Sequence, residues 1–143
     1  MDAAFAAEDG AVSRLGWFYL FKGNLISWIS ENPKRILTSS TEVECRGLSQ
    51  FAKENIWQRQ FQVELGLFKL DGPTMTYEDN TASILLSTNP GVPHKRSKHF
   101  GIEWAMFKEA VEQGEVIPVY VSTEEQPADI LTKSLAYKVY LFP

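Results

Sequence analysis

The chain has 143 residues, of which 44% are hydrophobic and 22% charged, and its formal net charge is −4. This length and composition are typical of one globular domain with a hydrophobic core, and they exclude a disordered tail and a generally basic nucleic-acid binder. No run approaches the roughly 18–20 apolar residues that cross a bilayer, so we expect no membrane partner. The single cysteine, Cys45, excludes an internal disulfide framework and favours an intracellular setting.

The first third of the chain predicts β-strands. Two aromatic and aliphatic runs, 15–21 and 25–29, flank a Gly23-Asn24 pair, and a two-residue connection of this type indicates a hairpin. A third strand is expected over 34–38.

A long helix is predicted over 41–65, where apolar residues recur at helical spacing. Gly47 lies inside this helix and costs about 1 kcal/mol relative to alanine, which a close helix–sheet contact would explain.

The second half of the chain alternates between strands and helices. A strand is expected over 74–77, a short helix over 81–86 and another strand over 115–121, where Pro118 suits an edge position or a bulge. Apolar residues spaced by four, three and four predict an amphipathic helix between these strands: Phe100, Trp104, Phe107 and Val111. A final helix begins at Pro127, a permitted first-turn residue. This order predicts a mixed α/β domain.

Four acids have the local setting that a carboxylate metal site needs, but each also has a structural explanation. Glu44 lies near the buried stripe of its helix and fits a capping box with Thr41. Asp79 follows a strand, where ligand sites collect in α/β sheets, and would equally serve as a helix N-cap. Asp129 gains from the dipole of the last helix, and Asp2 near the terminus suits simple solvation.

The residues that flank these acids are more specific than the acids themselves. Five segments, taken in order, resemble the ribonuclease H domain that ends the Pol polyprotein of copia-type LTR retrotransposons, and the resemblance covers about residues 2–135. The segments are Gly23-Asn24-Leu25-Ile26-Ser27-Trp28, Ser39-Ser40-Thr41-Glu42-Val43-Glu44, Tyr77-Glu78-Asp79-Asn80-Thr81-Ala82, Arg96-Ser97-Lys98-His99 and Ala128-Asp129-Ile130-Leu131-Thr132-Lys133.

This resemblance implies a ribonuclease H-like α/β fold over residues 1–143, with a mixed central β-sheet flanked by helices. It implies a metal-dependent endonuclease that cuts the RNA strand of RNA–DNA hybrids, using two Mg²⁺ or Mn²⁺ ions. The metal-binding and catalytic acids would be Asp2, Glu44, Asp79 and Asp129, with Glu42 as the alternative to Glu44. An upstream reverse transcriptase region would be the partner, in a cytoplasmic virus-like particle or the nucleus.

The densest basic run supplies the candidate phosphate contacts, Lys95, Arg96, Lys98 and His99. An ordinary solvated loop explains this run equally well. His99 matches the Lys-His of the family motif, and a role at a helix start or in the core suits it as well as a catalytic one.

The sequence departs from the family pattern at its first strand. The family has several strand residues before its first acid, so the sequence predicts a truncated first strand and an N-terminally truncated domain. An Asp-x-Asp of many relatives is Asp2-Ala3-Ala4 here, and Lys-His-Ile-Asp-Ile is Lys98-His99-Phe100-Gly101-Ile102. The alternative function is therefore a catalytically inactive retrotransposon remnant that keeps the fold as a binding or structural module.

Overall fold

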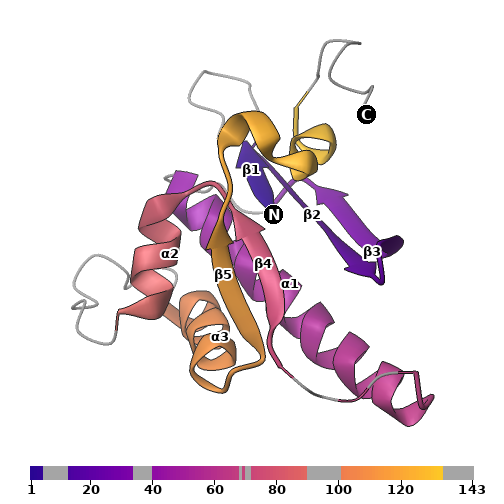
Figure 1. Cartoon of the computed structure of the whole chain (residues 1–143). Coiled ribbons are helices and arrows are strands. Elements are labelled where there is room, and N and C mark those ends of the chain that lie inside the picture. Colours follow the sequence, from indigo (N-terminus) through magenta and orange to yellow (C-terminus); the bar gives the residue numbers. More distant parts are fainter. Residues whose placement is uncertain (5–12, 34–39, 68, 70–71, 90–100, 134–143) are drawn as a thin grey trace.

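The structure is a computed structural model that describes residues 1–4, 13–33, 40–67, 69, 72–89 and 101–133. Its strands and helices alternate as in a mixed α/β domain (Figure 1). The elements in order are β1 (Asp2–Ala4), β2 (Arg14–Phe21), β3 (Asn24–Glu31), α1 (Ser40–Glu64), β4 (Thr74–Glu78), α2 (Thr81–Thr88), α3 (Gly101–Glu112), β5 (Val116–Tyr120) and the 3-10 helices η2 (Thr123–Glu125) and η3 (Pro127–Leu131).

The first sheet is antiparallel, with the strand order β1-β2-β3. The predicted hairpin is confirmed, but its two-residue connection is Lys22-Gly23 and not Gly23-Asn24. Both connecting residues have positive φ, 50° and 79°, as the tight turns that match strand twist require. Asn24 belongs to β3, and its side-chain amide donates a hydrogen bond to the Lys22 carbonyl.

The second sheet consists of β4 and β5, which pair in parallel from Thr74↔Val116 to Glu78↔Tyr120. Pro118 lies in β5, which pairs only with β4 within the described ranges, so the predicted edge position is confirmed. Strand β4 runs one residue beyond the predicted end and includes Glu78, which is 1% exposed.

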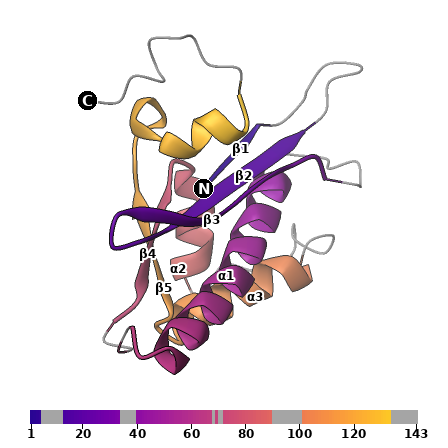
Figure 2. The ribbon, with the colours of Figure 1, turned by 90° about the vertical axis from the view of Figure 1, so that its right-hand side faces the viewer.

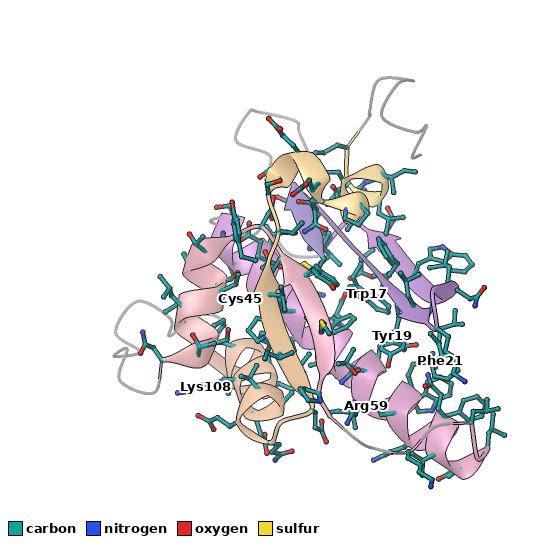
Figure 3. All side chains as sticks on the ribbon, in the orientation of Figure 1. Trp17, Tyr19, Phe21, Cys45, Arg59 and Lys108 are labelled. Atoms are coloured by element: carbon teal, nitrogen blue, oxygen red, sulfur yellow. The ribbon has the colours of Figure 1, made fainter. Side chains whose placement is uncertain are left out.

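The core lies between the strands and the helices α1 and α3, which cover one side of the strands (Figure 2). Trp17 and Tyr19 point from β2 toward α1, where both rings contact Phe51 at centroid distances of 6.0 Å (Figure 3). The predicted close contact at Gly47 is confirmed, because a Cβ there would lie 2.7 Å from Met1 Sδ.

A cavity of about 530 Å³ separates β2 from β4 on the N-terminal side of β1. It is lined by Phe18–Leu20 of β2, by Thr74–Tyr77 of β4 and by Met1. The Met1 ammonium donates a hydrogen bond of 2.7 Å to the Tyr77 carbonyl, so β1 meets β4 only through its first residue in the described structure. Burial lowers the pKa of this amino group, and the charge of Glu78 opposes that shift.

The mixed α/β class, the long α1 helix and the strand–helix order are confirmed. The predicted single central sheet is wrong in detail, because the strands form two small sheets. The predicted final helix is a 3-10 helix, η3, and not an α-helix. The predicted strand over 34–38 lies outside the described residues. No helix in the described part of the chain is both long and apolar enough to cross a membrane.

Candidate functional site

The four predicted acids come from four different elements that meet at one end of the molecule (Figure 1). Asp2 lies on β1, Glu44 near the start of α1, Asp79 directly after β4 and Asp129 in η3. Their charges influence one another, since Asp2 and Asp79 both raise the pKa of Glu44. The fold therefore brings residues that are up to 127 positions apart (129 − 2) into one electrostatic neighbourhood.

Asp2 and Asp129 form the most tightly held pair. The Lys133 ammonium lies 2.8 Å from Asp129 Oδ1 and 3.5 Å from Asp2 Oδ1. The Thr132 hydroxyl donates to the second oxygen of Asp2, and Asp2 is only 3% exposed. Two carboxylates and one ammonium leave one net negative charge in this pocket.

Burial and neighbouring charges together shift the pKa of Asp129. Burial raises its pKa, and the charge of Asp2 adds to the shift, while the hydrogen bond from Lys133 opposes both. The pair binds one cation, the Lys133 ammonium, and keeps a net negative charge that attracts positive ions.

The other two acids are held by separate neutral partners. The Asn80 side-chain amide donates to Glu44, and the Thr123 hydroxyl donates to Asp79 Oδ2 at 2.9 Å. Asn80 is also the N-cap of α2, because its side-chain oxygen accepts from Ala82 and Ser83. The capping explanation of Asp79 is therefore wrong, which leaves its half-buried carboxylate available for another role.

Glu78 is a fifth acid at this site, and the sequence prediction missed it. Its carboxyl Oε1 accepts from the Asn80 backbone N–H at 3.2 Å, while Oε2 has no hydrogen-bond partner among the described residues. Burial raises the pKa of Glu78 to about 8, and burial likewise raises that of Glu44 to about 7. Strand alternation would have revealed it, since Glu78 shares the buried face of β4 with Thr76.

Stability should fall as the pH rises toward 8. The folded-state pKa values of Glu78 and Glu44 lie above their ordinary value of 4.5, so between about pH 4.5 and 8 the folded chain holds more protons than the unfolded chain. The free energy of unfolding, measured by urea titration, is expected to decrease from pH 5 to pH 8. Glu78→Gln should flatten this slope, whereas the exposed Glu112→Gln should keep it. Equal slopes in both variants would contradict the assignment.

Gly16 lets η3 approach the first sheet. A Cβ at Gly16 would lie 2.6 Å from Leu131 Cβ and 3.0 Å from Thr132 Cγ2. Gly16→Ala should therefore push away the segment that carries Asp129, with a stability loss of about 1–3 kcal/mol in thermal unfolding. Gly101→Ala is the matched control, because its added Cβ meets no atom of the described residues within 4 Å. Gly16→Ala should unfold at a lower temperature than Gly101→Ala, and equal thermal midpoints would contradict the close contact at Gly16.

Hard oxygen donors of this kind suit Mg²⁺ or Mn²⁺. Within the described residues, however, no three side chains of His, Cys, Asp or Glu are grouped closely enough to hold a metal ion. The donor chemistry fits a divalent cation, and at Asp2 and Asp129 a cation, the Lys133 ammonium, already bridges the carboxylates. The phosphate-binding candidates Lys95, Arg96, Lys98 and His99 lie outside the described residues.

Comparison with known proteins gives relatives along most of the chain. It is 37% identical over 136 residues to the retrovirus-related Pol polyprotein from transposon RE1 of Arabidopsis thaliana, which is 94% of this chain and 9% of that protein. It is 35% identical over 133 residues to the corresponding polyprotein from transposon TNT 1-94 of Nicotiana tabacum, which is 92% of this chain and 10% of that protein. Identity to the Ty1-DR5 Gag-Pol polyprotein of Saccharomyces cerevisiae is 25% over 139 residues, covering 97% of this chain and 8% of that protein.

The chain thus spans about a tenth of the length of these relatives. No protein-family model and no solved structure matches it. Its homologues at 35–37% identity are Pol polyproteins of retrotransposons, which confirms that part of the predicted resemblance. The mixed α/β structure is compatible with a ribonuclease H-like fold.

Proposed function

We propose that this chain is a ribonuclease H-like domain of a retrotransposon Pol polyprotein and cuts the RNA strand of RNA–DNA hybrids. The observation that carries the proposal is the meeting of Asp2, Glu44, Asp79 and Asp129 at one end of a mixed α/β domain. An electrostatic neighbourhood of buried and half-buried acids suits divalent metal better than it suits nucleic acid directly, because phosphates are repelled by carboxylates.

Each acid has a distinct task in this proposal. Asp2 and Asp129 would hold the metal ion with the carboxylates that now contact the Lys133 ammonium. Asp79 is half-buried and accepts a hydrogen bond from the exposed Thr123, so its carboxylate would join the metal site from the solvent side. Bound Mg²⁺ or Mn²⁺ would supply an activated water and stabilise the leaving 3′ oxygen.

Glu44 needs to lose its proton to join such a site. Its pKa is raised to about 7 mainly by burial, and a nearby divalent cation would favour the carboxylate. The proposed site therefore favours neutral to mildly alkaline conditions.

The remaining partners follow from the same proposal. Lys95, Arg96, Lys98 and His99 would contact the phosphates of the hybrid, and 2′-hydroxyl contacts would select RNA over DNA. The upstream reverse transcriptase region would be the protein partner, and the cytoplasmic virus-like particle or the nucleus the location.

A second candidate function is a non-enzymatic remnant that binds nucleic acid or protein. The absence of a ready-made group of three metal ligands among the described residues favours it. Incubation of the chain with labelled RNA–DNA hybrid, RNA duplex and DNA duplex, with Mg²⁺ or with EDTA, separates the two functions. Cleavage of the hybrid alone, abolished by EDTA, supports the enzyme, and hybrid binding without cleavage supports the remnant.

A further inference from the structure

Lys133 occupies the position between the two carboxylates that a metal ion would need. Its ammonium lies between the Oδ1 atoms of Asp2 and Asp129, at 3.5 and 2.8 Å. The hydrogen bond from Thr132 occupies the second oxygen of Asp2, so the two Oδ1 atoms are the ones that face a shared cation.

The ammonium is bound firmly but is not locked in place. The ammonium contacts both carboxylates, and the closer contact is a hydrogen bond of 2.8 Å to Asp129 Oδ1. The side chain is 35% exposed and lies at the edge of the pocket, whereas Asp2 is buried at 3%. A lysine on a flexible stem can leave such a site toward solvent, which the carboxylates cannot.

A divalent ion and the ammonium cannot share these oxygens. Mg²⁺ binds carboxylate oxygens at about 2.0–2.1 Å, closer than the ammonium lies now, and the two positive charges would repel strongly at that separation. We propose that Lys133 is the resident counter-ion of the Asp2–Asp129 pair, which metal must displace in order to bind. This inference rests on the proposed metal-dependent function.

Lys133 neutralises one of two adjacent carboxylates, which limits their repulsion while metal is absent. The same contact competes with metal, so it lowers the apparent metal affinity. A merely structural lysine would have the opposite consequence, because its loss would loosen the site and weaken metal binding.

Titration with Mn²⁺, followed by the loss of its free-ion electron paramagnetic resonance signal, tests the displacement. Lys133→Met should bind Mn²⁺ about fivefold to tenfold more tightly than the unmodified chain, since the competing cation is gone. Lys108→Met is the matched control, because Lys108 pairs with Glu112 at 3.6 Å and the same four-residue spacing on α3, away from η3 (Figure 3). It should leave the affinity unchanged. Unchanged or weaker binding by Lys133→Met overturns the proposal.

A second measurement uses the unmodified chain and does not depend on the folding of a variant. Metal should release Lys133 from Asp2 and Asp129 into solvent, so acetylation of its amine by acetic anhydride should accelerate at least about threefold with saturating Mn²⁺. The acetylation rate of Lys108 should not change. No acceleration at Lys133 overturns the displacement.

Asp129→Asn distinguishes a failure of the displacement proposal from a failure of the proposed metal-dependent function. If the unmodified chain, Lys133→Met and Asp129→Asn all fail to bind Mn²⁺, the metal site itself is wrong and the proposed function fails with it. If the unmodified chain binds Mn²⁺ and Asp129→Asn does not, the site stands, and only the response of Lys133→Met decides the displacement.

Discussion

Asp79→Asn should reduce cleavage of an RNA–DNA hybrid at least about a hundredfold. Loss of a residue that merely supports a metal ligand typically costs tenfold to a hundredfold, so loss of a direct ligand should cost no less. Asparagine keeps the size of the side chain and an oxygen that can accept the hydrogen bond from Thr123, so the change removes charge with little change of shape. The measurement is the initial rate of cleavage in Mg²⁺.

Glu112→Gln controls for the general effect of removing one negative charge. Glu112 lies in α3, is exposed and forms an ion pair with Lys108 at 3.6 Å. Its replacement should leave the cleavage rate within about twofold. Undiminished cleavage by Asp79→Asn would remove Asp79 from the site, even if the chain is a nuclease.

A four-residue strand joined to the amino group of Met1 should stabilise the domain by about 2 kcal/mol, which raises the thermal midpoint by roughly 5–10 °C. The cavity between β2 and β4 presents two strand edges to such a segment. The buried ammonium of Met1 would become a neutral amide that keeps its hydrogen bond to Tyr77. The sheets would then join in the order β3-β2-β1-β4-β5.

The register specifies which added residues must be apolar. Because Asp2 pairs with Gly16 and Ala3 with Leu15, the second residue before Met1 lies opposite Tyr19, which faces α1. The sequence Val-Thr-Val-Thr before Met1 therefore places valine on the core face. The hydroxyl of Thr76, which has no hydrogen-bond partner within the described ranges, also lines this cavity.

Val-Pro-Val-Pro is the matched control, because it keeps both valines and removes two N–H donors. The proline extension should raise the thermal midpoint much less than the threonine extension does. Amide hydrogen exchange should slow at residues 18–20 and 75–77 in the threonine version alone. Equal midpoints for the two extensions would mean that no strand forms in the cavity.

Hydrophobic spacing in the sequence predicted most helices and strands. The exact turn and helix ends depend on backbone conformations that the sequence does not show. The helical spacing around Leu48 gave α1 to within one residue at each end. The hairpin turn shifted by one residue because Lys22 adopts positive φ, which is uncommon for lysine. The η3 helix is short because Thr132 leaves the helical conformation at φ −122° and ψ −25°.

The candidate site was predictable through flanking residues more than through chemistry. Asp79 by itself resembles an N-cap, and only the structure shows that Asn80 makes the cap. Glu78 is not evident from the sequence because the predicted strand ends at residue 77, whereas β4 continues to Glu78, and a buried acid is uncommon. The role of Lys133 depends on a contact with Asp2, 131 residues away, which no local pattern encodes.

Cleavage of a labelled RNA–DNA hybrid in Mg²⁺ by the chain extended with Val-Thr-Val-Thr tests the central claim most directly. The extension continues β1 on the N-terminal side of Asp2, and positioning matters there because errors of about 1 Å are enough to cost about a hundredfold in rate. We expect the extended chain to cleave only the RNA–DNA hybrid, and we expect EDTA or the Asp79→Asn substitution to abolish this cleavage. No cleavage by this stabilised version would contradict the claim that the four acids form a nuclease site.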